Sequence, residues 1–90
     1  MSEITIAVQV LLFAQLAELA QRNHLEIAVP VRDDQKVTVQ HVLDLVQQSF
    51  PAVALHVASA AVAVNEHYAD RAAQVREGDV IALIPPVSGG

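Results

Sequence analysis

The 90-residue sequence contains no cysteine and no tryptophan, and only 3% of its residues are aromatic. Without cysteine, neither a disulfide framework nor a thiolate zinc site can form. The scarcity of aromatic residues predicts a core built mainly from alanine and branched aliphatic side chains. Since 53% of the residues are hydrophobic and 17% are charged, the composition is that of one small folded domain rather than of a disordered chain.

Positive charge is also scarce, with five basic residues against ten acidic ones and a formal net charge of -5. The basic residues are scattered and form no patch: Arg22, Arg32, Lys36, Arg71 and Arg76. Because a nucleic-acid-binding protein needs a basic face to replace phosphate counterions, we expect no nucleic-acid partner. An acidic domain suits a basic protein partner, although the charge is equally compatible with a surface that is merely well solvated.

Long hydrophobic runs are missing as well. No apolar segment reaches the roughly 20 residues that a membrane-spanning helix requires. The first residues, Met1-Ser2-Glu3, lack the cationic segment with which a signal peptide begins. We therefore expect a cytoplasmic protein without a membrane partner.

Hydrophobic periodicity predicts an α+β domain. We expect strands at residues 4–13, 25–31, 60–64, 67–69 and 80–84, a short helix at 14–22, and a longer helix from an N-cap at Thr38 to about Ser49. Residues 51–59 read as a loop with a helical turn. One amphipathic helix can cover one face of a sheet, so the expected architecture is a mixed, mostly antiparallel sheet curled around that helix.

Two strands allow finer predictions. The first strand alternates, and one parity is wholly large and apolar, which predicts a core-facing side made of Ile4, Ile6, Val8, Val10 and Leu12. Phe13 falls on the opposite parity. Pro30 cannot donate a ladder hydrogen bond, so the second strand should lie at a sheet edge or end there.

The sequence Pro85-Pro86-Val87-Ser88-Gly89-Gly90 follows the last predicted strand directly. Two prolines remove two backbone donors and favour an extended chain, so this segment should leave the sheet as a flexible tail of residues 85–90 on a domain of residues 1–84. Fully stretched, it reaches at most about 20 Å. Because glycine has no Cβ, the tail presents its terminal carboxylate on a very narrow arm that can enter a tunnel in another protein. A frayed terminus without function is the alternative reading.

The same residues carry a resemblance to a known family. Gly78-Asp79-Val80 leading through Ile84 into Pro-Pro-Val-Ser-Gly-Gly resembles the terminal motif of molybdopterin synthase small subunits, the sulfur carriers of the MoaD/ThiS group. Leu12-Phe13-Ala14 and Val64-Asn65 resemble two further segments of that family, in the same element order. The resemblance implies a β-grasp (ubiquitin-like) fold. The chain departs from compact members by a slightly long N-terminus and a long loop at residues 31–37.

The resemblance also implies a chemistry. In that family an adenylating enzyme that resembles ubiquitin activators uses ATP to join the terminal carboxylate, here that of Gly90, to AMP, and a persulfide sulfur then yields a thiocarboxylate. The thiocarboxylate donates sulfur to cyclic pyranopterin monophosphate in the active site of a large subunit, with which the small subunit forms a heterotetramer. Gly89 would permit close approach. This chain would be the sulfur-donating subunit of a sulfurtransferase, with no bound cofactor, no metal, and the catalytic side chains in its partner.

Docking to that partner requires an apolar surface near the root of the tail. We predict that Phe13, Tyr68 and Ile84 form it, continued by Pro85, Pro86, Val87 and Ser88, because large apolar groups on an outer face mark interfaces. The alternative is that Phe13 caps one end of the core and that Tyr68 is a half-exposed strand residue.

Other candidate sites are weaker. The four histidines, His24, His41, His56 and His67, have no metal-ligand spacing. His41 and Asp44 read as a solvated pair on the polar face of the longer helix. Three alternatives to the sulfur-donating subunit remain open: a ubiquitin-like protein modifier, a sulfur carrier for thiamine or another thiolated product, and an inert interaction module. The proline pair disfavours the thiamine carriers, which typically lack it, whereas related archaeal modifiers resemble this tail.

Overall fold

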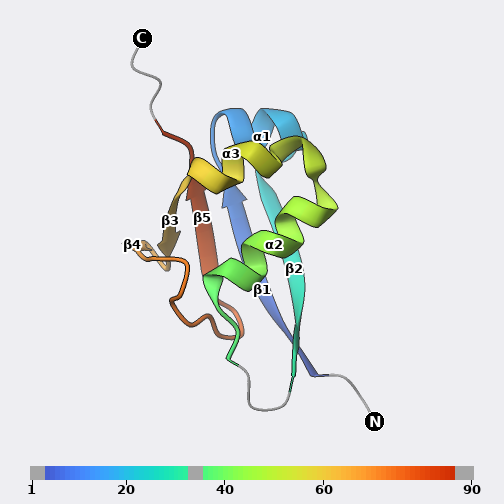
Figure 1. The fold of residues 1–90 in the computed structure, drawn as a ribbon, viewed down its shortest axis with the longest axis vertical. Helices are drawn as coiled ribbons and strands as arrows, with labels where there is room; N and C mark the ends of the chain where they lie inside the picture. Colours follow the sequence, from blue (N-terminus) through green and yellow to red (C-terminus); the bar gives the residue numbers. More distant parts are fainter. Residues whose placement is uncertain (1–3, 33–35, 87–90) are drawn as a thin grey trace.

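The computed structural model describes residues 4–32 and 36–86, which form one sheet with helices packed on one of its faces (Figure 1). The strands are β1 (Ile4–Leu12), β2 (His24–Val31), β3 (Ala61–Val64), β4 (His67–Tyr68) and β5 (Val80–Ile84). The helices are α1 (Gln15–Ala20), α2 (Val39–Ser49), the 3-10 turn η1 (Pro51–Val53) and α3 (Ala54–Ser59). No helix among these residues is long and apolar enough to cross a membrane.

The sheet has the strand order β2-β1-β5-β3-β4. The first and last strands, β1 and β5, run parallel at its centre, and every other neighbouring pair is antiparallel. The predicted mixed, mostly antiparallel α+β sheet is therefore confirmed. Because β1 and β5 are parallel, Leu12 and Leu83 reach the same end of the sheet, and the chain leaves β5 there (Figure 1).

The strand β1 turns one side to the core, but over less of its length than its alternation predicts. Val8 and Val10 are fully buried and Leu12 nearly so, whereas Ile6 is half-buried and Ile4 is 67% exposed. The prediction that Ile4 faces the core is wrong because β1 and β2 extend past α2 at this end, where none of the described helices covers them (Figure 1). At its other end, β1 pairs with β5 over residues 9–12, as well as with β2.

The helix α2 supplies the largest share of the core from the helical side, with Val39, Val42, Leu43 and Val46 fully buried. As predicted, Thr38 is its N-cap: the Thr38 hydroxyl accepts a hydrogen bond from the His41 N–H at 3.4 Å. His41 Nδ1 in turn accepts from the Thr38 N–H at 3.1 Å, so histidine takes the place that glutamate or glutamine has in a capping box. Asp44 accepts from the Gln40 amide at 2.8 Å. His41 and Asp44 are both exposed, as predicted for solvated side chains, and each makes its own local hydrogen bond.

The segment after α2 is more ordered than predicted. Residues 51–59 form η1 and α3, whose Val53 and Val57 are fully buried. The Arg71 guanidinium donates through Nη2 to the carbonyls of Val57, Ala58 and Ala60 at 2.9, 3.1 and 3.4 Å, and so satisfies carbonyls at the C-terminal end of α3.

Candidate partner-binding surface

The outer face of the sheet is the surface that the helices leave open. Among the described residues, α1, α2 and α3 all lie against the inner face (Figure 1). Paired residues in neighbouring strands share a face, so the register identifies the outer set. Leu11 pairs with Ala82, Ala82 with Ala63, and Ala63 with Tyr68, which makes one apolar row across four strands.

A second row lies next to the root of the tail. Ile84 pairs with Ala61, and Phe13 follows directly after Leu12, the partner of Leu83. Phe13 and Ile84 therefore lie at the same end of two adjacent parallel strands, Phe13 just after β1 and Ile84 as the last residue of β5. Phe13 is 46% exposed and Ile84 is half-buried. An apolar strip thus runs up to the point where the chain enters Pro85.

The three residues predicted to bind a partner share this face but do not form one tight cluster. Phe13 and Ile84 are neighbours, whereas Tyr68, 80% exposed, lies on the edge strand β4 with Ala63 between it and Ala82. Three residues that were not predicted join Phe13 to the rest of this face: Leu11, Val80 and Ala82. Alternation places each of them on the outer parity of its strand, but only the pairing of β1 with β5 brings them together beside Phe13.

A hollow of about 470 Å³ lies on this outer face. Its lining is apolar on the β1–β5 side and polar at the β3–β4 turn: Leu11, Phe13, Val80, Ala82, Asn65 and Glu66. The hollow has the form that an apolar side chain of a partner would fill, with the Glu66 carboxylate available to a basic group beside it.

Asn65 fixes the polar rim of the hollow. Its backbone N–H donates to the Val80 carbonyl at 2.8 Å, its side-chain oxygen accepts from the Val80 N–H at 3.0 Å, and its side-chain amide donates to the Asp79 carboxylate at 3.0 Å. Asn65 and Glu66 both have positive φ, 50° and 72°, as in the two-residue hairpin turns that favour asparagine at the first position. The turn between β3 and β4 is thereby tied to the start of β5.

The root of the tail is partly described. Pro85 is half-buried and Pro86 is exposed. The predicted binding residues Val87 and Ser88 and the predicted reactive residues Gly89 and Gly90 lie outside the described residues.

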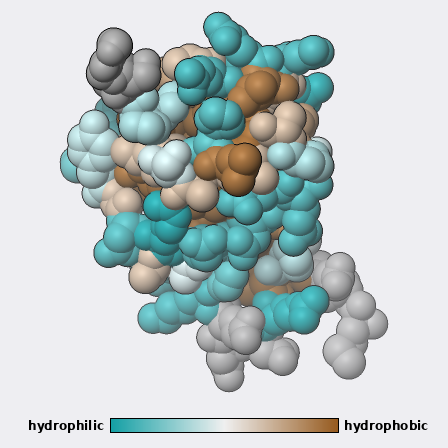
Figure 2. All heavy atoms as spheres, turned by 45° about the horizontal axis from the view of Figure 1, so that its top comes forward, coloured by the Kyte–Doolittle hydropathy of each residue, from teal (hydrophilic) through white to brown (hydrophobic). Residues whose placement is uncertain are grey.

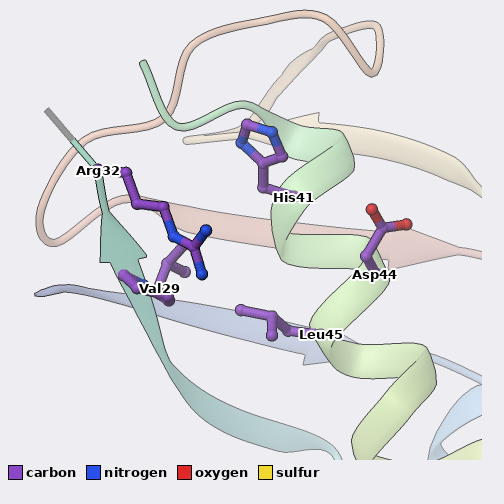
Figure 3. A pocket seen from close by; sticks show the side chains of 6 residues that line it. Val29, Arg32, His41, Asp44 and Leu45 are labelled. Carbon is purple, nitrogen blue, oxygen red and sulfur yellow. The ribbon is translucent and has the colours of Figure 1, made fainter. Parts of the chain in front are cut away.

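A second hollow, of about 260 Å³, lies on the other side of the molecule between the edge strand β2 and α2. Val29 and Leu45 form its apolar part, and Arg32, His41 and Asp44 approach it from β2 and α2 (Figure 3). Pro30 completes the lining. We call this hollow the β2–α2 recess. None of its residues is among those predicted to bind the partner.

The remaining exposed large apolar residues are isolated. Leu55 on α3 is 86% exposed and Leu19 on α1 is 41% exposed. In Figure 2, which brings this end of the molecule forward, hydrophobic surface occurs as separate areas among hydrophilic groups. Within residues 4–32 and 36–86, no group of three or more histidine, aspartate or glutamate side chains is arranged to hold a metal ion.

Comparison with known proteins identifies the family. The sequence model of the ThiS family matches residues 10–90. The molybdopterin synthase sulfur carrier subunit of Drosophila erecta is 35% identical over 88 residues, which cover 94% of this chain and 92% of that protein. The protein of the same name from Arabidopsis thaliana is 34% identical over 86 residues, covering 96% and 85%.

Solved structures agree with the observed topology. The crystal structure of SAMP1 from Haloferax volcanii superposes with a TM-score of 0.77 at 32% identity, covering 93% of this chain and 99% of that one. Urm1 from Trypanosoma brucei, at 16% identity and a TM-score of 0.64 over all of both chains, shares the fold alone. The fold is thus the ubiquitin-like β-grasp.

One solved structure is of a complex. It contains subunits 1 and 2 of the molybdopterin-converting factor from Helicobacter pylori, with a TM-score of 0.64, 23% identity, and coverage of 94% of this chain and 100% of that one. The family match and the full-length relatives above 30% identity lead to one conclusion: this chain is a member of the ThiS family and a homologue of the sulfur carrier subunits of molybdopterin synthase.

Proposed function

We propose that this protein is the sulfur-donating small subunit of a molybdopterin synthase and that the carboxylate of Gly90 carries the sulfur. The observation that carries the proposal is the position of the apolar outer face, which reaches the root of the tail through Phe13 and Ile84. A partner docked on this face lies where it can receive residues 85–90. The similarity to carrier subunits along nearly the whole chain supports the same function.

The chemistry begins with activation of a poor electrophile. The Gly90 carboxylate attacks the α-phosphate of ATP on an adenylating enzyme, which forms an acyl-adenylate and releases pyrophosphate. A persulfide sulfur then attacks the acyl carbon and AMP leaves. Cleavage of the resulting acyl disulfide by a second thiol frees the thiocarboxylate. Since this chain has no cysteine, both sulfur nucleophiles come from other proteins or small thiols.

Sulfur transfer follows in the large subunit. In this proposal, residues 1–84 form the docking body and residues 85–90 the arm, with Gly89 and Gly90 passing through a channel too narrow for side chains. Cyclic pyranopterin monophosphate accepts the sulfur there. The small subunit contributes the sulfur and the docking surface, while the side chains that act on the pterin belong to the large subunit.

Intact mass spectrometry tests the reactive group. Incubation with an adenylating enzyme of the family, ATP and a persulfide donor should give the mass expected for one oxygen replaced by sulfur, and iodoacetamide should then alkylate that species. Alkylation separates the thiocarboxylate from oxidised Met1, which has nearly the same mass but does not react. The chain lacking Gly90 is the matched control. An unmodified acid in the complete reaction would refute the proposal, as would a native protein that continues beyond Gly90.

A second function is favoured by one comparison. The structure of small archaeal modifier protein 1 from Haloferax volcanii matches at a TM-score of 0.77, with 29% and 32% identity in two determinations. The same acyl-adenylate could be attacked by a lysine amine, which would join Gly90 to a target protein. Mass spectrometry of cell extracts distinguishes the two functions. The last tryptic site of this chain is Arg76, so a modifier leaves residues 77–90 attached to target lysines after trypsin digestion, and a dedicated sulfur donor does not.

A further inference from the structure

The edge strand β2 and the β2–α2 recess provide the basis for a second interaction surface. The strand β2 is terminal in the sheet, and among the described residues its outer side has no strand neighbour. The hydrogen-bond register shows which backbone groups point that way. Leu12 N–H donates to the Asn23 carbonyl at 3.0 Å, so this pair is hydrogen-bonded, and the pairs Val10–Leu25, Val8–Ile27 and Ile6–Val29 follow at every second position.

The intervening residues of β2 therefore direct their backbone groups to the open edge. This assignment has independent support on β1, where Ala7 and Gln9 turn away from β2: the Gly78 N–H donates to the Ala7 carbonyl at 2.8 Å, and the Gln9 N–H donates to the Asp79 carbonyl at 3.0 Å. Glu26 and Ala28 each present an N–H and a carbonyl to the edge, and Pro30 presents a carbonyl alone.

The recess lies beside this edge on the inner side of the sheet. Val29 points inward from β2 and is only 2% exposed, and half-buried Leu45 faces it from α2 (Figure 3). A strand added to the edge of β2 would place every second side chain over this recess. The volume of about 260 Å³ suits aliphatic side chains.

The charges around the recess select the kind of segment. His41 Nδ1 accepts a hydrogen bond from Thr38 and one Asp44 oxygen accepts one from Gln40, but the Asp44 carboxylate keeps its negative charge on the α2 side of the recess. Arg32 supplies the positive charge of the rim at the end of β2, and its guanidinium extends toward α2 (Figure 3). An arginine fork pairs best with a carboxylate. The complementary ligand therefore has aliphatic residues at alternate positions and an acidic residue at the Arg32 end.

We propose that β2 and the β2–α2 recess bind an extended, aliphatic and acidic segment of a partner protein by strand addition. The site is separate from the outer face, because Val29 and Leu11 point to opposite sides of the sheet and because β2 and β4 are its two opposite edges. The protein can thus be held at β2 while its outer face and tail engage another protein. This inference does not depend on the sulfur-carrier function.

The test is a titration of the 15N-labelled protein with the peptide acetyl-Thr-Val-Thr-Val-Thr-Asp-Thr-amide and with its reversed sequence, followed by NMR. One of the two orientations should shift the amide signals of β2 and α2. Ala28→Pro should abolish the shifts, because it removes an edge N–H that the β1–β2 ladder does not use, whereas the matched variant Ala28→Thr should retain them. Arg32→Glu should weaken binding about fivefold or more, and Arg76→Glu, the charge control, should leave it unchanged.

Leu45→Lys provides a test that leaves the edge of β2 intact, since it should close the recess and reduce the shifts. Absence of shifts in β2 with both peptides would overturn the proposal, as would shifts confined to the outer face or insensitive to Ala28→Pro and Leu45→Lys. Analytical ultracentrifugation without peptide tests whether a second copy of this chain binds the edge of β2 instead. A dimer that dissociates in the Ala28→Pro variant would show that it does.

Discussion

At the residue scale, the start of α2 depends on a reciprocal pair in which histidine replaces the usual acid or amide. Thr38 and His41 each accept a backbone hydrogen bond from the other. The next two N–H groups, of Val39 and Gln40, donate to the carbonyls of Ala73 and Arg71 at 3.0 and 2.9 Å. Four donors that would otherwise be unsatisfied are thereby paired. The loop at residues 70–75 is therefore a structural part of the helix start.

We expect Thr38→Ala to lower the free energy of unfolding by about 1 kcal/mol, because the His41 N–H loses its acceptor. Urea denaturation at neutral pH measures the change. His41→Gln is the control, since a carboxamide can also accept from the Thr38 N–H and should leave stability nearly unaltered. A Thr38→Ala protein as stable as the parent would show that solvent replaces the cap without cost.

Asn65 makes side-chain hydrogen bonds and also adopts a positive φ, and substitution can separate these two contributions to stability. We expect Asn65→Ala to lower the free energy of unfolding by about 2 kcal/mol. It removes the side-chain hydrogen bonds to the Val80 N–H and the Asp79 carboxylate, and it places alanine at a φ of 50°. Asn65→Gly removes the same bonds without backbone strain, so it should cost less. Equal losses in the two variants, measured by thermal and urea denaturation, would assign the whole effect to the side-chain bonds.

At the element scale, strong periodicity predicted the strands and α2, and the helix α3 was missed where periodicity is weak. The helix α3 has the sequence ALHVAS, in which alanine and valine are mixed and few polar residues mark an outer side. Only Val57 of this helix is fully buried. Alternation identified the inward side of β1 correctly, but it carries no information on how far the helices extend over it. Ile4 was therefore misplaced.

The candidate surface was predictable only where a single residue indicates it. Phe13 and Tyr68 were identified as large apolar groups on outward positions. Leu11 and Ala82 were not, because each is unremarkable until the register of β1 and β5 brings them together. That register joins the two ends of the chain, and a local sequence pattern does not encode it.

The short helix α3 is held at its C-terminal end by Arg71. We expect Arg71→Met to destabilise the protein by about 2 kcal/mol, because the charged donor to the carbonyls of Val57, Ala58 and Ala60 is lost. Hydrogen exchange should show the loss of protection concentrated in α3, with α2 less affected. Arg71→Lys should recover part of the stability, since one ammonium can reach fewer of these carbonyls. Uniform loss of protection would indicate a global effect and contradict this local role.

At the scale of the whole molecule, the parallel pairing of β1 and β5 brings the C-terminal ends of the first and the last strand to the same end of the sheet. Phe13 directly follows the first strand and Ile84 ends the last, and both lie where the chain enters Pro85. The helices pack on the opposite side, so docking on the outer face leaves the core undisturbed (Figure 1). The sheet thus separates the surface that would meet a partner from the packing that stabilises the fold.

This separation predicts that docking and stability respond to different substitutions. Phe13→Asp should weaken binding to a molybdopterin synthase large subunit at least about tenfold, because a carboxylate replaces an apolar contact of the proposed interface beside the root of the tail, while the melting temperature changes little. Leu55→Asp introduces the same charge on a more exposed leucine of α3, and it should leave binding unchanged. Isothermal titration calorimetry with each variant measures the difference. If Leu55→Asp weakened binding as much as Phe13→Asp, the partner would be held by the helical side, and the outer face of the sheet would lose its proposed role.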